Sequence, residues 1–109
     1  MRASRACKTD ANQADIVAAL KAIGCSVAVT SGAGDGFPDL VVGIPGANML
    51  MEIKNPEQDK SHRALTAEQQ IFHTEWRGPI TVVHTVAEAL GVINRLRQQM
   101  WNEPRAVDK

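Results

Sequence analysis

The sequence lacks the features that would place it at once in several familiar classes. Its two cysteines, Cys7 and Cys25, and its three histidines have no partners at metal-ligand spacing, which excludes the usual cysteine- and histidine-based metal sites. The cysteines also favour a reducing, cytoplasmic compartment. No apolar run is long enough to cross a bilayer, no charged-then-apolar leader opens the chain, and there is no internal repeat, so we expect no membrane association.

The chain also lacks an excess of charge of either sign. Twelve basic and twelve acidic residues give a formal net charge of zero, whereas nucleic-acid-binding domains are usually basic overall. The distribution is uneven, because residues 1–8 carry Arg2, Arg5 and Lys8 and no acid. Two interpretations of this segment are open, a solvated terminus and a basic arm that contacts phosphates.

What the sequence does contain fits one globular α/β domain. Its 109 residues, 44% of them apolar and 22% charged, suffice for one core, which we place at about residues 10–100 between the basic N-terminal segment and a C-terminal tail. A three-stranded meander followed by a helical crossover indicates a mixed four-stranded sheet flanked by helices. In the order α-β-β-β-α-β-α, the predicted elements are residues 10–23, 25–30, 39–44, 49–54, 66–77, 80–84 and 85–100.

A glycine-rich loop, residues 31–38, separates the first two predicted strands. It lacks the Gly-Lys-Ser/Thr ending of a phosphate-binding loop, so that motif is excluded. Its glycines instead predict a close approach of this backbone to another backbone or to a ligand.

The most unusual stretch is a predicted β-hairpin, residues 36–54, with three charged residues on two otherwise apolar strands. Asp39 follows Pro38 at the start of one strand, and Glu52 and Lys54 close the other. Side chains alternate faces along a strand, so Glu52 and Lys54 share a face. If the turn comprises four residues, 45–48, Asp39 lies on the same face, opposite Lys54 and diagonal to Glu52. A slip of one residue would move Asp39 to the other face.

Two carboxylates and a lysine on one face have the chemistry of a metal-dependent hydrolase. Hard oxygen ligands favour Mg²⁺ or Mn²⁺ over zinc, and such a cation activates water and neutralises charge on a phosphate. The lysine would position the attacking water and stabilise the developing negative charge. This set predicts phosphodiester hydrolysis. The alternative is an exposed ion pair between Glu52 and Lys54 at a strand end, which the preceding Pro38-Asp39 disfavours.

Two glutamines each have two possible roles. Gln13 follows Asp10 by three residues and Gln69 follows Thr66 by three, so both fit the capping box of a helix N-terminus. Both also lie on the apolar stripe of their helix, which should pack over the sheet and can bring a polar side chain to a site. Spacing leaves both roles open.

These motifs resemble the PD-(D/E)xK nuclease signature, which Pro38-Asp39 and Glu52-Ile53-Lys54 match. The closer similarity is to the virus-type replication-repair nuclease (VRR-NUC) domain in its small stand-alone phage and bacterial forms. The similarity covers residues 12 to about 93. It includes Asn12-Gln13, Gly36-Phe37-Pro38-Asp39-Leu40, Glu52-Ile53-Lys54 and Leu65-Thr66-x-x-Gln69.

The resemblance implies a restriction-endonuclease-like core and a Mg²⁺- or Mn²⁺-dependent deoxyribonuclease of a bacterial or phage-infected cell. Asp39, Glu52 and the Ile53 carbonyl would bind the metal, and Lys54 would be the catalytic lysine. Gln69 would be the additional site glutamine of the family. Gln13 stands where many relatives carry a glutamate, so it would complete the site without adding charge. Similar stand-alone proteins resemble Holliday-junction resolvases and act as homodimers, which implies a branched or structured DNA substrate.

Two alternatives to the nuclease remain open. One is a catalytically inactive DNA-binding or assembly module on the same fold, which the zero net charge favours. The other is a small α/β regulatory domain in which Asp39 only starts a strand after a proline. The intact Asp-Glu-Lys set favours the nuclease. The basic residues expected to contact DNA around its site are Lys8, Lys60, Arg63 and Arg77.

Overall fold

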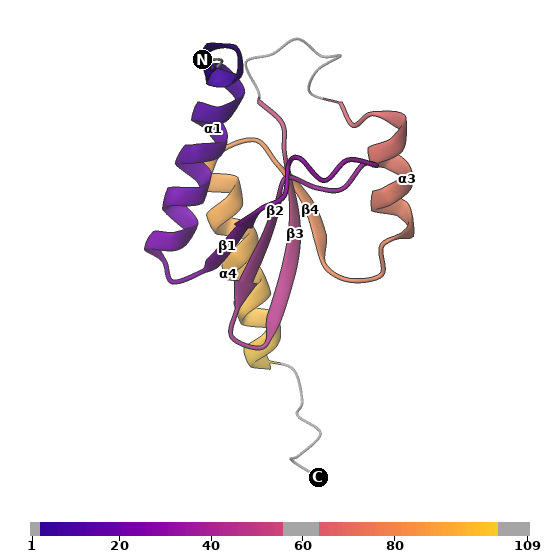
Figure 1. Cartoon of the computed structure of the whole chain (residues 1–109). Helices are drawn as coiled ribbons and strands as arrows, with labels where there is room; N and C mark the ends of the chain where they lie inside the picture. The colour runs from indigo at the N-terminus through magenta and orange to yellow at the C-terminus, as the bar shows by residue number, and fades with distance from the viewer. Residues whose placement is uncertain (1–2, 56–63, 103–109) are drawn as a thin grey trace.

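The computed structural model describes residues 3–55 and 64–102, with residues 3–10 described as helical backbone only. Along this part of the chain the elements follow the order α-β-β-β-α-β-α (Figure 1). They are α1 (Ala3–Ala22), β1 (Ser26–Val29), β2 (Leu40–Ile44), β3 (Ala47–Ile53), α3 (Ala67–Glu75), β4 (Ile80–Val83) and α4 (Val86–Asn102). Among the described helices, none is long and apolar enough to cross a membrane.

The four strands form one mixed sheet in the order β1-β2-β3-β4. The first three strands are an antiparallel meander, and β4 joins β3 in parallel. A parallel neighbour requires a crossover connection, and the segment that contains α3 provides it. The prediction of a mixed four-stranded sheet with helices is confirmed.

The β2–β3 turn has two residues, so the predicted four-residue turn is wrong. Ile44 pairs with Ala47 across Pro45-Gly46. Proline suits the first central position of a type II turn, and Gly46, with φ +86°, suits the second. Pro45 and Gly46 therefore form the whole turn, and the chain reverses between Ile44 and Ala47. The register moves by an even number of residues, which leaves the predicted shared faces unchanged.

The hydrophobic core lies on the face of the sheet that α1 and α4 cover. In Figure 1, α4 runs behind the strands and α1 lies beside it. The core side chains of β2 are Leu40, Val42 and Ile44, which alternate with half-buried residues along the strand. They pack with apolar side chains of the two helices, namely Ile16, Leu20, Ala89, Ile93 and Leu96.

Helix α1 begins at Ala3, so the predicted start at Asp10 is wrong, and Asp10 with Gln13 forms no N-terminal cap. Residues 3–9 contain neither proline nor glycine and are rich in alanine, arginine and lysine. These are strong helix formers, and nothing in the segment interrupts the helix before Asp10. The predicted end is confirmed, because Gly24 follows with φ +95°, as a C-terminal cap requires.

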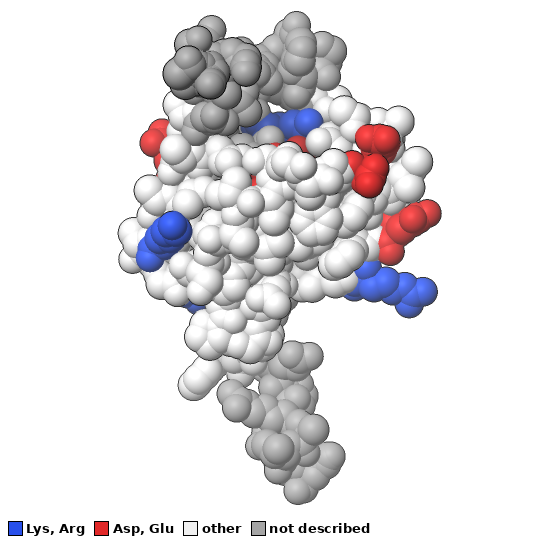
Figure 2. Space-filling view, in the orientation of Figure 1, with Lys and Arg blue, Asp and Glu red and all other residues white. Residues whose placement is uncertain are grey.

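The second face of the sheet is less covered than the first. It carries the small or half-buried side chains of Ala28, Val41 and Val82 and the exposed Asn48. Figure 2 shows this face with few charged groups, except in a hollow at the end of the sheet where β3 finishes. In that hollow basic and acidic atoms lie side by side.

Candidate active site

Asp39 and Glu52 face each other across the β2–β3 ladder. The register pairs Leu40 with Met51, and extending it by one residue places Asp39 opposite Glu52. The predicted position of Asp39 opposite Lys54 is therefore wrong, but its predicted face is the one it occupies. Directly opposed residues approach more closely than diagonal ones, with Cβ atoms about 4.5–5.5 Å apart. The shorter turn thus brings the two carboxyl groups nearer than predicted.

Pro38 and Asp39 alter the ladder at the point where β2 begins. The Pro38 carbonyl accepts a hydrogen bond from the Thr30 hydroxyl at 2.8 Å. The Ile53 backbone N–H, which would pair with the Pro38 carbonyl in a regular ladder, donates to Asp39 Oδ2 at 2.9 Å. This hydrogen bond holds the Asp39 carboxylate against β3. In the extended register Pro38 lies opposite Ile53 and has no N–H to donate to the Ile53 carbonyl. This carbonyl therefore lacks its usual ladder donor beside the two carboxyl groups.

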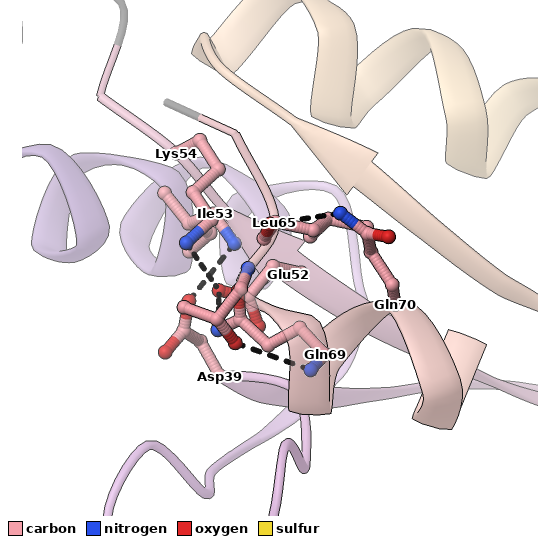
Figure 3. Close-up of polar contacts among 8 residues, drawn as sticks. Asp39, Glu52, Ile53, Lys54, Leu65, Gln69 and Gln70 are labelled. Carbon is pink, nitrogen blue, oxygen red and sulfur yellow. Dashed lines mark hydrogen bonds and ion pairs between the residues drawn. The ribbon is translucent and has the colours of Figure 1, made fainter. Parts of the chain in front are cut away.

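Glu52 is the central group of the site. Its side chain is only 3% exposed, and Oε2 accepts a hydrogen bond from Gln69 Nε2 at 3.0 Å. The Lys54 ammonium lies 3.6 Å from the same oxygen. The other oxygen, Oε1, is buried and has no hydrogen-bond partner within the described chain. Figure 3 shows the four side chains of Asp39, Glu52, Lys54 and Gln69 converging from the residue before β2, the end of β3 with the residue after it, and the first turn of α3.

The environment of Glu52 raises the pKa of its carboxyl from 4.5 to about 7. Burial is the largest cause, because it penalises the charged form. The negative charge of Asp39 raises the pKa further, while the charge of Lys54 opposes the shift. Two neighbouring carboxyl groups, one of them buried, favour binding of a proton, and a cation bound between them would replace that proton.

Gln69 has both of the roles that its spacing allowed. Its Oε1 accepts from the Thr66 backbone N–H at 2.9 Å, and its own backbone N–H donates to Thr66 Oγ1 at 3.2 Å, which completes the predicted capping box. Its Nε2 is left to donate to Glu52. One amide therefore starts α3 and ties the helix to the carboxylate.

Gln13 is not joined to the carboxylates. It lies on α1 and lines a surface depression with Val17, Lys21 and Val29. Val29 pairs with Leu40, so this depression lies on the helix-covered side of the sheet, whereas Asp39 and Glu52 point to the other side. No hydrogen bond links Gln13 to either carboxylate in the described part of the chain.

The predicted close approach of the glycine-rich loop is made by Gly36 to the first turn of α3. A Cβ atom at Gly36 would lie 2.5 Å from the Glu68 carbonyl oxygen and 3.1 Å from the Gln69 nitrogen. The φ of Gly36 is +79°, which a side chain would also strain. The absence of a side chain at this position lets the loop bearing Asp39 pack directly against the helix that bears Gln69.

We therefore expect Gly36→Ala to lower the free energy of unfolding by more than Gly34→Ala does. Gly34 has nearly the same backbone strain, with φ +83°, but an added Cβ would meet nothing within 4 Å. The difference between the two variants is the overpacking against Glu68, roughly 1–3 kcal/mol. Urea unfolding of both variants measures this difference. Equal losses of unfolding free energy would show that the loop can move away from α3 without cost.

His73 is a residue near the site that the sequence did not identify. It lies one turn beyond Gln69 on α3, and its Nε2 is buried without a hydrogen-bond partner among the described residues. Burial lowers the pKa of this imidazole, and the charge of Lys54 lowers it further. The ring is thus a neutral group close enough to Lys54 to be affected by its charge.

The predicted DNA contacts are placed only in part. Arg77 is exposed just beyond the end of α3, and Lys8 falls within α1. Lys60 and Arg63 lie outside the described residues.

The described residues contain no cluster of three or more His, Cys, Asp and Glu side chains arranged to hold a metal. A metal at this site would therefore depend on two carboxylates and a carbonyl. Searches against protein-family models, curated proteins and solved structures find no match to this chain.

Proposed function

We propose that the protein is a metal-dependent endonuclease that cleaves structured DNA, built on a restriction-endonuclease-like core. The observation that carries this proposal is the buried Glu52 carboxyl, opposite Asp39 and in contact with Lys54 and Gln69. A sheet position with this burial normally holds an apolar side chain, and a buried carboxyl destabilises the fold unless it is compensated. Strongly shifted carboxyls of this kind concentrate at functional sites.

The donor set fits Mg²⁺ or Mn²⁺. Asp39, Glu52 and the Ile53 carbonyl offer hard oxygen atoms, which these cations prefer. Among the described residues, Glu52 Oε1 has no hydrogen-bond partner, and the Ile53 carbonyl faces Pro38, which cannot donate to it. When bound, such a cation supplies Lewis acidity that lowers the pKa of a water molecule and neutralises charge on a phosphate.

The chain's own residues support this chemistry in separate ways. Lys54 places a positive charge beside the carboxylates, where it would bind a phosphate oxygen and stabilise the charge that develops during attack. Gln69 orients the Glu52 carboxylate through its amide N–H. Asp39 is oriented by the Ile53 N–H, so both carboxyl groups are held before any ligand arrives.

Cleavage assays with a labelled four-way junction, a flap, a duplex and a single strand test the proposal. We expect nicking with Mg²⁺ or Mn²⁺, none with a chelator, and a loss of about a hundredfold in Asp39→Asn, which keeps an acceptor for the Ile53 N–H. Asp15→Asn, at an exposed position of α1, is the matched control and should cleave normally. DNA binding without cleavage under every metal would instead favour the inactive DNA-binding or assembly module.

We also propose that the active form is a homodimer, as for the similar stand-alone nucleases. A four-way junction presents two equivalent strands, and paired cuts need two copies of the site. Light scattering on a size-exclusion column at micromolar concentration should give twice the 11.8 kDa chain mass. A monomer under these conditions contradicts the dimer but leaves the nuclease chemistry intact.

A further inference from the structure

Three aromatic rings form a continuous stack beside the proposed nuclease site. Phe37 meets Phe72 edge-to-face with ring centroids 5.2 Å apart, and Phe72 stacks on Trp76 at 5.3 Å with an interplanar angle of 14°. The chain has only two phenylalanines, two tryptophans and no tyrosine. Three of these four rings thus gather at one place, and the fourth, Trp101, lies at the end of α4.

The two ends of the stack differ in exposure. Phe37 and Phe72 are half-buried, whereas Trp76 is 43% exposed. The backbone at Trp76 is fixed, because its N–H donates to the Phe72 carbonyl at 3.0 Å, and the indole itself is held by its stacking on Phe72. Gly78 also packs against it, since a Cβ there would lie 3.1 Å from the indole nitrogen. The stack therefore ends in a fixed aromatic surface open to solvent.

This surface lies within reach of the proposed site. Phe37 precedes Pro38-Asp39 in the chain, and Phe72 follows Gln69 by about one turn of α3. Trp76 follows Gln69 by seven residues, which corresponds to about 10 Å along a helix at 1.5 Å per residue. Phosphates of a B-form strand are about 3.4 Å apart along the axis, so this distance spans about three nucleotides. A strand that is bound near Gln69 and Glu52 and runs along α3 would place a base about three nucleotides away at the indole.

The charge of the protein favours contacts with bases. With a net charge of zero, the protein has no overall positive field to attract DNA, so contacts other than long-range electrostatics must contribute more to affinity. Aromatic side chains supply such contacts by stacking on bases, whatever the sequence. The exposed Arg77 is the neighbour of Trp76 in the chain and adds a cation for the adjoining phosphate.

We propose that Trp76, supported by Phe72 and Phe37, is a stacking platform for an unpaired DNA base, so that the enzyme selects DNA with a single-stranded segment. The faces of a base inside a duplex are covered by its neighbours, and only an unpaired or terminal base can lie against the indole. The selection of a cleavage substrate rests on the proposed nuclease function, whereas the stacking itself can be measured without cleavage.

The test uses Trp101→Phe, which leaves Trp76 as the single tryptophan. With chelator present, the protein is titrated with a single-stranded thymidine oligonucleotide, the same backbone with abasic sites, and a blunt duplex. We expect the single strand to quench the Trp76 emission and the abasic strand to leave it unchanged. The blunt duplex, in which only the two terminal base pairs have an open face, should quench it much less than the single strand. In the native background, Trp76→Ala should weaken single-strand binding about five- to 150-fold, with Trp76→Phe close to native and Trp101→Ala unchanged.

Three results would overturn the proposal. They are equal quenching by the abasic strand, single-strand affinity that survives Trp76→Ala, and loss of a dimer in light scattering of Trp76→Ala, which would identify the surface as a protein interface. Failure of the nuclease proposal is distinguishable, because it leaves base stacking in chelator without metal-dependent cleavage. The converse, cleavage that is indifferent to Trp76 and to unpaired bases, overturns the stacking platform alone.

Discussion

Replacing Glu52 with glutamine is expected to stabilise the protein and to abolish the metal-dependent cleavage that we propose for it. The pKa of Glu52 is about 7 in the folded protein, against an ordinary value of 4.5. This difference corresponds to on the order of 3 kcal/mol of destabilisation once the carboxyl is ionised. A glutamine amide has the shape of the protonated carboxyl and cannot ionise. The variant therefore lacks this destabilisation at pH 8, together with one charged group of the proposed metal site.

The sign of the pH dependence follows from the direction of the shift. Because the folded-state pKa lies above the unfolded value, the folded protein holds an extra proton between about pH 4.5 and 7. The contribution of Glu52 to stability therefore falls as the pH rises through this range. Urea unfolding in chelator should show Glu52→Gln close to the native protein at pH 5 and more stable than it at pH 8.

Glu88 supplies a matched control of opposite sign. Its pKa is lowered, first by a hydrogen bond with the His84 side chain, so Glu88→Gln should not stabilise the protein at pH 8. Addition of Mg²⁺ should raise the stability of the native protein at pH 8 and leave Glu52→Gln almost unchanged, since a ligand stabilises the state that binds it. A Glu52→Gln variant that is less stable than the native protein at pH 8 would show that the fold does not oppose ionisation of the Glu52 carboxyl.

The sequence predicts which residues share the face of the candidate site, but it does not predict which residues of β2 and β3 pair with each other. Alternation of side chains along the strands predicts that Asp39, Glu52 and Lys54 share a face. The turn is two residues shorter than predicted, and a shift of the register by an even number of residues leaves them on that face. The turn itself depended on whether Pro45-Gly46 would occupy the two central positions. A dipeptide with the preferred residues for a type II turn closes the tighter hairpin.

Other features depend on contacts that are distant in sequence. Gln69 both caps α3 and donates a hydrogen bond to Glu52. The spacing of residues in the sequence cannot tell whether a glutamine has one of these roles or both. The predicted cap at Asp10 failed because a helix continues through a capping residue when its preceding segment also forms helix. The contact of Gly36 with the first turn of α3 required the folded arrangement of two elements, although the glycine itself signalled a close approach.

Lys54→Ala is expected to weaken both metal binding and cleavage, for one electrostatic reason. Lys54 lies 3.6 Å from Glu52, and its charge lowers the pKa of that carboxyl against burial and against Asp39. Without this charge the pKa of Glu52 rises further, so a metal ion must compete with a more tightly held proton. Loss of the charge that we propose to stabilise the transition state should in addition reduce cleavage about 10²- to 10³-fold.

Lys54→Arg separates the two effects, because arginine keeps the positive charge but not the compact ammonium group. We expect the pH at which Mn²⁺ half-saturates the site, measured by isothermal titration calorimetry, to move upward in Lys54→Ala and to return in Lys54→Arg. Cleavage should recover only in part in Lys54→Arg, since a planar guanidinium cannot occupy the same position beside Glu52 Oε2. If metal binding keeps its native pH dependence in Lys54→Ala, the lysine does not control the protonation of Glu52, and its role is confined to the bound phosphate.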